Sequence, residues 1–132
     1  FNVGIFGMVN TFHEKVYKER GVKFYGEFYS DLEYDETGYL VIAKGRNKYY
    51  PTDRAVERCL RAMNENKVKT VQGNDVVVGC ETICVHSDTP NAVEILKALR
   101  EKISSDKKIP QKTSNGNHTK MPYIVDKKWK KF

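Results

Sequence analysis

The first hundred residues alternate between short apolar runs and stripes of helical period. An apolar run over residues 1–6 predicts a strand, and residues 22–29 predict another. Between them, residues 11–20 predict a helix, because Thr11 and Glu14 have the spacing of a capping box and the apolar side chains share one face. This β-α-β order typically places two parallel strands side by side.

The rest of the pattern indicates the same fold class. Turn signals and changes of period predict a strand over 39–43, a polar loop over 44–50, a helix over 52–64, a hairpin of strands over 68–71 and 76–78, a strand over 82–86 and a helix over 89–103. The sequence therefore predicts an α/β domain over residues 1–103. About three core strands are few for a self-sufficient sheet, and the chain starts at Phe1 rather than Met, so we expect part of a larger fold.

The strand predicted over 82–86 ends in the most informative segment of the chain. Its apolar run stops at His86, and Asp88 follows two residues later. Thr89 suits the N-cap of the next helix and Pro90 suits its first turn. His86 and Asp88 are therefore expected where the carboxyl end of a strand meets a helix, which is where α/β sheets and barrels bind ligands.

A second polar cluster follows the strand predicted over 22–29. Glu27 and Asp31 lie at the end of that strand, so in a parallel sheet they should face the same edge as His86 and Asp88. Carboxylates there can hold a substrate ammonium group or position water, and a histidine can exchange protons near neutral pH.

Each cluster also has a purely structural interpretation. Glu27 and Asp31 could be solvated charges at a strand end. Asp88 could stabilise only the amino terminus of the last helix, and His86 could donate to a backbone carbonyl. The pattern alone leaves both interpretations open.

The formal net charge of +6 is unevenly distributed. Residues 1–103 carry 15 basic and 15 acidic side chains, whereas residues 104–132 carry 8 lysines and 2 aspartates. After residue 104 the helical pattern gives way to Lys, Ser, Asn and Gly, which predicts a basic, disordered tail. Such a tail can bind an acidic protein surface, but its single Trp among lysines is too short a motif to indicate nucleic acid.

Several other classes of protein are not indicated. The chain has three cysteines, and Cys80 and Cys84 would lie about 13 Å apart along a strand, beyond disulfide reach, so we expect a cytoplasmic location. No apolar run approaches membrane-spanning length. The sequence contains no P-loop, dinucleotide fingerprint, nucleophile elbow or convincing metal-ligand spacing, so motifs assign neither a metal nor a cofactor site.

The two clusters also carry a family resemblance. In the LamB/YcsF family, also known as the A-subunit of bacterial 5-oxoprolinase, a Glu-x-Phe-Ala-Asp-Arg-x-Tyr segment is followed by an Asp-Gly-x-Leu-Val turn, a Gly-Lys-Val…Gly hairpin and an Ile-Cys-Val-His-Gly-Asp-Thr-Pro-x-Ala motif. The chain has similar segments at residues 27–34, 36–41, 66–73 and 83–92. Over roughly residues 8–103 it resembles the carboxyl-terminal half of this family.

The resemblance implies a fold and an activity. The fold would be an incomplete part of a distorted (β/α) barrel of the glycoside hydrolase/deacetylase type. The activity would be the ATP-dependent opening of 5-oxoproline, a cyclic amide, to L-glutamate, together with other subunits. Phosphorylation of the carbonyl oxygen would make it a leaving group, and water positioned by a general base would attack. The resemblance places Glu27, Asp31, His86 and Asp88 around this substrate, with His86 or Asp88 as base and Glu27 and Asp31 as positioning groups.

The chain departs from the family pattern in three ways. Leu32 stands where many members have Arg, so an anion contact is lost, and Ser87 replaces a Gly. The amino-terminal half of the family is not in this chain. The alternative function is therefore a truncated, non-catalytic remnant that binds a protein partner or acidic surface through residues 104–132.

Overall fold

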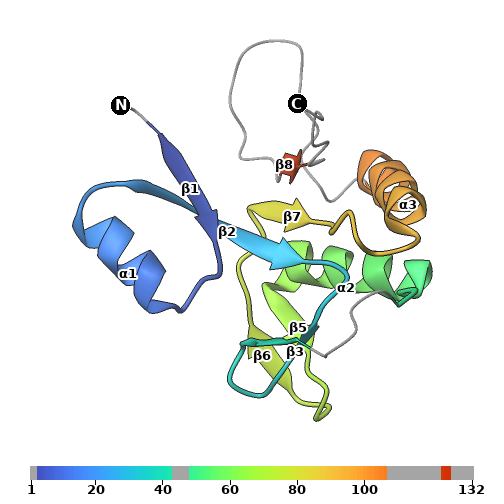
Figure 1. Cartoon of the computed structure of the whole chain (residues 1–132), viewed down its shortest axis with the longest axis horizontal. Helices are drawn as coiled ribbons and strands as arrows, with labels where there is room; N and C mark the ends of the chain where they lie inside the picture. The colour runs from blue at the N-terminus through green and yellow to red at the C-terminus, as the bar shows by residue number, and fades with distance from the viewer. Residues whose placement is uncertain (1–2, 43–47, 107–122, 126–132) are drawn as a thin grey trace.

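The computed structural model describes residues 3–42, 48–106 and 123–125. Its centre is a four-stranded sheet of order β1-β2-β7-β8, in which every neighbouring pair is parallel (Figure 1). The strands are β1 (Gly4–Gly7), β2 (Lys23–Tyr29), β7 (Thr82–Cys84) and β8 (Tyr123–Val125). Parallel neighbours need crossover connections, and helices lie in the connections that follow β1 and β7.

Strands β2 and β7 end level with each other. Their register pairs Glu27 with Thr82 and Tyr29 with Cys84. Because the two strands are parallel, the chain leaves both of them at the same edge of the sheet. This shared edge carries the two polar clusters that the sequence singled out.

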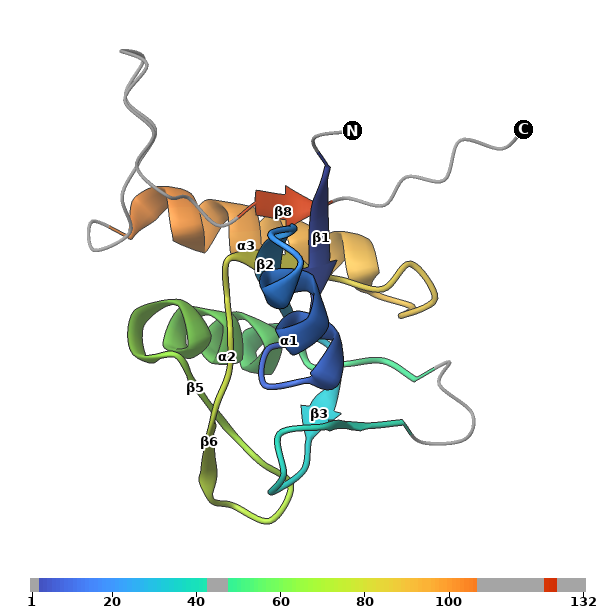
Figure 2. The same ribbon diagram turned by 90° about the vertical axis from the view of Figure 1, so that its left-hand side faces the viewer.

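Within the described residues, three helices pack around the sheet. They are α1 (Phe12–Glu19), α2 (Thr52–Glu65) and α3 (Ala92–Ser105). Figures 1 and 2 show α2 and α3 lying side by side, whereas α1 lies at the β1 end of the sheet. Phe28 and Ile83 from the sheet are fully buried together with Cys59, Ile95 and Leu99 from α2 and α3, and removing such apolar side chains from water stabilises the fold.

Two small antiparallel hairpins extend away from the sheet in both views (Figure 2). The first joins β3 (Glu33–Tyr34) to β4 (Leu40–Val41), and the second joins β5 (Lys67–Lys69) to β6 (Asp75–Val77). Their turns contain Gly38 and Gly73 with φ of 83° and 92°. Glycine reaches these left-handed conformations without the Cβ clash that other residues suffer.

Most of the predicted elements are confirmed close to their expected bounds. The helices expected over 11–20 and 52–64 are α1 and α2, and the hairpin expected over 68–78 is β5–β6. The parallel pairing of β1 with β2 is confirmed as well. Thr11 caps α1 by accepting the Glu14 N–H at 3.3 Å, although the Glu14 carboxylate accepts the N–H of Asn10 rather than that of Thr11.

The prediction that Thr89 begins the last helix is wrong. Helix α3 starts at Ala92, with Asn91 at the N-cap position and no side-chain capping bond. The Thr89 hydroxyl donates to the Asp31 carboxylate instead. Strand β7 likewise ends at Cys84 and not at His86, whose backbone N–H also donates to Asp31. In both places the residue expected to belong to the local element donates to Asp31, a carboxylate from a distant segment.

The structure also adds a strand that the pattern did not predict. Within the segment expected to be a basic, disordered tail, residues 123–125 form β8 and pair with β7. The remainder of that expectation, residues 107–122 and 126–132, lies outside the described residues. The same is true of residue 43 of the predicted strand and residues 44–47 of the predicted loop.

None of the described helices is long and apolar enough to cross a membrane.

Candidate active site

Asp31 and His86 form the centre of the candidate site. Asp31 lies two residues beyond β2 and His86 two residues beyond β7, so the level strand ends bring them together. His86 Nδ1 lies 2.7 Å from Asp31 Oδ1, and the His86 backbone N–H donates to Oδ2 at 3.0 Å. The Thr89 hydroxyl donates to the same Oδ2. Asp31 is 6% exposed, so protein donors rather than water satisfy its carboxylate.

Both members of this pair are charged at neutral pH. The hydrogen bond to Asp31 raises the pKa of His86 from 6.5 to about 9. Burial acts to raise the pKa of Asp31, but the hydrogen bonds from His86 and Thr89 together outweigh burial and lower that pKa below 3.8. The pair is therefore an imidazolium held against a carboxylate, and His86 has no free lone pair to act as a base near pH 7.

Tyr29 links this pair to Glu27. The Tyr29 ring stacks on the His86 ring with centroids 5.8 Å apart and an interplanar angle of 13°. Burial raises the pKa of Tyr29, and the charge of Glu27 and hydrogen bonding to its carboxylate raise it further. Glu27, Tyr29 and His86 thus form a continuous polar and aromatic strip from β2 to the end of β7.

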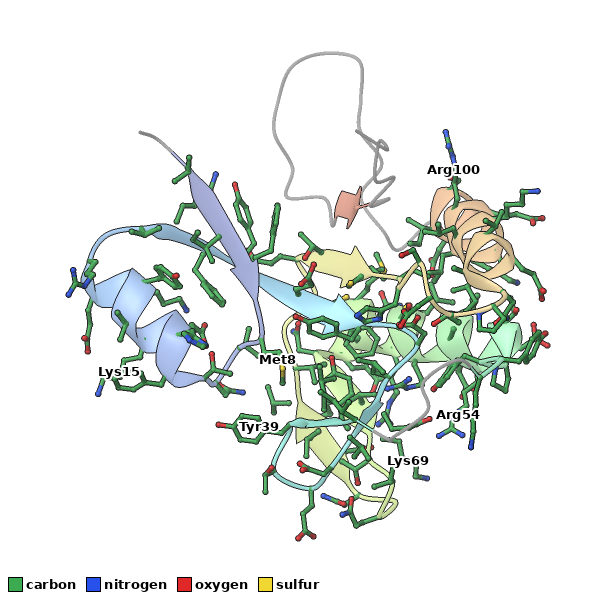
Figure 3. The ribbon with its side chains drawn as sticks, viewed as in Figure 1. Met8, Lys15, Tyr39, Arg54, Lys69 and Arg100 are labelled. Carbon is green, nitrogen blue, oxygen red and sulfur yellow. The ribbon has the colours of Figure 1, made fainter. Side chains whose placement is uncertain are left out.

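Glu27 also borders a small pocket beside the site. Glu27 is 7% exposed, and the pocket walls include Asn10 and Thr11 after β1 and Tyr39 before β4. Figure 3 labels Met8 and Tyr39, two residues of the pocket wall, near the centre of the molecule. The pocket places a buried carboxylate beside amide and hydroxyl groups that can exchange hydrogen bonds with a small polar molecule.

The four predicted site residues therefore have different places in the structure. Asp31 and His86 are in direct contact, and Glu27 joins them through Tyr29. Asp88 is exposed on the turn that links His86 to Thr89. The predicted convergence of the two clusters at one edge is confirmed for Asp31 and His86.

The sulfur of Cys84 completes the surroundings of the imidazole. Cys84 Sγ lies 3.8 Å from His86 Nε2, while the Cys84 carbonyl accepts both the N–H and the hydroxyl of Ser30, at 3.1 and 2.9 Å. The last residue of β7 therefore holds the loop that carries Asp31. Within residues 3–42, 48–106 and 123–125, no group of three or more His, Cys, Asp or Glu side chains could hold a metal ion.

Comparison with known proteins identifies the family. The model of the LamB/YcsF family matches residues 2–117 of the chain. The chain belongs to the LamB/YcsF family. The His86–Asp88 motif and the segment around Asp31 both lie inside the matched region, so the contact between Asp31 and His86 joins two parts of the same family domain.

Two named relatives agree with this assignment. The chain is 36% identical to a 5-oxoprolinase A-subunit of Pseudomonas putida over 91 residues, which are 69% of this chain and 36% of that protein. It is 35% identical over 104 residues to the lactam utilization protein lamB of Emericella nidulans, covering 75% of this chain and 40% of that protein.

A solved structure agrees as well. The crystal structure of a lactam utilization protein from Thermus thermophilus matches with a TM-score of 0.67 at 26% identity, over 77% of this chain and 40% of that one. In each of these three comparisons the chain spans about two fifths of its relative or less.

Three residues of the site were missed by the sequence analysis. Thr89 was assigned to a helix cap, and Tyr29 was treated as part of a strand. Arg58 lies on the buried face of α2 and donates to the loop around Asp31. Of these three residues, only Arg58 could have been singled out from the sequence, because a basic residue three positions after Ala55 interrupts an apolar helix face.

Proposed function

We propose that this chain is part of an ATP-dependent 5-oxoprolinase that opens the lactam 5-oxoproline to L-glutamate together with partner subunits. The Asp31–His86 pair is the observation that carries the proposal, because it lies at the carboxyl ends of parallel strands, inside the LamB/YcsF match. Relatives named as 5-oxoprolinase and lactam utilization proteins support the substrate class.

We further propose that the sheet is part of a distorted (β/α) barrel of the glycoside hydrolase/deacetylase type. Four neighbouring parallel strands, with helices in their connections, are typical of barrel segments. The chain covers about two fifths of the Thermus thermophilus structure that it resembles, which supports an incomplete barrel.

His86 suits the role of an acid better than that of a base. Its Nδ1 is committed to Asp31, so Nε2, which contacts only the Cys84 sulfur at 3.8 Å among the interactions described above, would be the nitrogen that passes a proton to a substrate. As water adds to the activated carbonyl carbon and the C–N bond breaks, His86 would protonate the departing nitrogen. A second water would then hydrolyse the resulting acyl phosphate to L-glutamate and inorganic phosphate. Asp31 keeps the imidazolium charged and oriented, while Glu27 and Asp88 would position water and accept its proton.

ATP would supply the phosphoryl group that activates the carbonyl oxygen. The described residues at this edge do not fit a triphosphate, because carboxylates dominate it and its nearest arginines are engaged elsewhere. Arg58 donates to backbone carbonyls, and Arg54 pairs with Glu33 at 3.0 Å. We therefore propose that ATP binds outside the described residues, and we assign no ATP contact to this segment.

The test measures 5-oxoproline-dependent ATP hydrolysis by the full-length protein assembled with its partner subunits. We expect Asp31→Asn and His86→Gln each to lower kcat by about 100-fold or more, because each removes half of the proton-donating pair. His13→Gln, on the exposed surface of α1, is the matched control and should retain turnover. Unchanged turnover in both site variants would refute the assignment of the site.

A second candidate function rests on the segregated charge of residues 104–132. Their 8 lysines and 2 aspartates favour binding of an acidic protein surface. Salt-sensitive binding that disappears when this segment is deleted, without any turnover by the assembled enzyme, would favour a non-catalytic binding protein over the hydrolase.

A further inference from the structure

Arg58 is a buried cation close to the candidate site. It lies on α2 and is 7% exposed, on the same helix face as Ala55, Cys59 and Ala62. Burial of a guanidinium group is costly unless its donors find acceptors. The hydrogen-bond partners of Arg58 therefore indicate the structural role of this buried charge.

The Arg58 guanidinium binds the backbone on both sides of Asp31. Nη1 donates to the Ser30 carbonyl at 3.1 Å, and Nη2 donates to the Leu32 carbonyl at 2.6 Å. Nη1 also donates to the Tyr50 hydroxyl. On the opposite side of the loop, Ser30 donates twice to the Cys84 carbonyl. The segment that carries Asp31 is thus fixed between α2 and the end of β7.

Aromatic rings rather than a carboxylate surround this cation. The guanidinium carbon lies 5.6 Å from the ring centroids of Phe28 and Tyr50 and 5.8 Å from that of Tyr34. Ring faces and carbonyl dipoles can stabilise a desolvated cation. The nearest link to an acid passes through the Tyr50 hydroxyl, which donates to Glu33 at 2.9 Å. The planar fork of Arg58 therefore serves two carbonyls, a geometry that the single ammonium group of a lysine cannot reproduce.

We propose that Arg58 is a positioning residue, which clamps the backbone from Ser30 to Leu32 and so holds the Asp31 carboxylate against the His86 ring. Arg58 acts through this loop and is not a catalytic residue. An effect of Arg58 on turnover rests on the proposed function, whereas the clamping of the backbone does not.

The influence of Arg58 on the pair is geometric rather than electrostatic. The groups that set the pKa of His86 are Asp31 and Cys84, and those that set the pKa of Asp31 are His86 and Thr89. The charge of Arg58 is not among the main influences on either residue. Loss of the clamp should therefore change the His86 pKa only if the Asp31 carboxylate moves.

The experiment follows the imidazole signals of the full chain by NMR between pH 5 and 11. The chain has three histidines, so His13 and His118 serve as internal references for His86. The variants are Arg58→Gln and Arg58→Lys, and the matched control is Arg54→Gln, one turn earlier on α2. Arg54 is largely exposed and contacts Glu33 rather than the backbone around Asp31.

We expect the His86 pKa to fall from about 9 by at least about one unit in both Arg58 variants and to stay constant in Arg54→Gln. Recovery of the original pKa in Arg58→Lys would mean that charge suffices, and it would overturn the clamp. An unchanged His86 pKa in a folded Arg58 variant would overturn it too.

Tyr50→Phe keeps the proposal falsifiable if the Arg58 variants do not fold. This variant removes one partner of Nη1 and leaves the guanidinium in place. It should lower the His86 pKa by a smaller amount, and no change would count against the clamp. If the pKa falls as expected but turnover of the assembled enzyme does not, the clamp stands and the proposed function fails.

Discussion

At the scale of single residues, the candidate site is a set of buried charges with specific partners. Asp31 receives hydrogen bonds from His86 and Thr89, and the backbone around it receives hydrogen bonds from Arg58. An isolated charge in such surroundings would be strongly destabilising, so these groups depend on one another. Removing one partner should therefore lower the free energy of unfolding by more than the contribution of the single contact.

The pH dependence of stability follows from the shifted pKa values. The pKa of His86 is raised to about 9, so its contribution is complete below pH 6.5 and is lost as the pH rises through 9. The pKa of Asp31 is lowered, so its contribution is complete above pH 3.8 and is lost as the pH falls further. The pair should stabilise the fold most between these limits.

Urea unfolding of the full chain at several pH values measures this effect. We expect the free energy of unfolding to fall between pH 6.5 and 10, by on the order of 2 kcal/mol after allowance for solvent screening. His86→Gln should flatten this part of the profile, and His13→Gln should leave it intact. A profile that keeps its slope without His86 would contradict the prediction.

At the scale of elements, the strand and helix ends depend on packing between segments. The connection between β6 and β7 passes very close to β2. A Cβ atom added at Gly79 would lie 3.0 Å from the Cα of Gly26 and would clash with a methyl group of Val9. The connection stays beside β2 after this contact, because the Glu81 N–H donates to the Gly26 carbonyl at 2.8 Å just before β7 begins.

Gly79→Ala should therefore destabilise the fold by about 1–3 kcal/mol in urea unfolding, because the added methyl group overpacks the contact. Val9→Ala provides space for that methyl group and is the matched partner variant. We expect the double variant to lose less stability than the sum of the two single variants. Strictly additive losses would show that the close approach does not limit substitution at Gly79.

At the scale of the whole molecule, the sheet depends on a strand from near the end of the chain. Strand β8 pairs with β7 over residues 82–84 and 123–125 and covers an edge of the strand that leads to His86. An uncovered edge leaves backbone N–H and C=O groups without strand partners. The last part of the chain is therefore structurally linked to the candidate site.

Deletion of residues 123–132 should cost about 2 kcal/mol more stability than deletion of residues 126–132, which retains β8. Thermal and urea unfolding of the two shortened chains provide the comparison. The larger deletion should also increase hydrogen exchange at the amides of Thr82, Ile83 and Cys84. Equal stabilities and equal exchange rates would show that β8 contributes nothing to the sheet.

Much of the fold could be predicted because its signals are local. The capping box at Thr11, the apolar face of α2 and the turn glycines each act within a few residues of the chain, and the structure has the corresponding elements. The prediction that polar residues after β2 and β7 meet at one edge is confirmed for Asp31 and His86. It follows from the parallel order of the strands, which β-α-β patterning already indicates.

The tertiary structure alone decided the partners of the buried polar groups. No local pattern shows that Thr89 donates to Asp31 rather than capping α3, since the carboxylate lies 58 positions earlier in the chain. The pairing of β8, the clamp by Arg58 and the protonated state of His86 likewise depend on contacts between distant segments. The sequence determined which elements form, because local hydrogen bonding and apolar periodicity select them. Long-range packing decided which charges are paired, because burial is stable only where distant donors and acceptors meet.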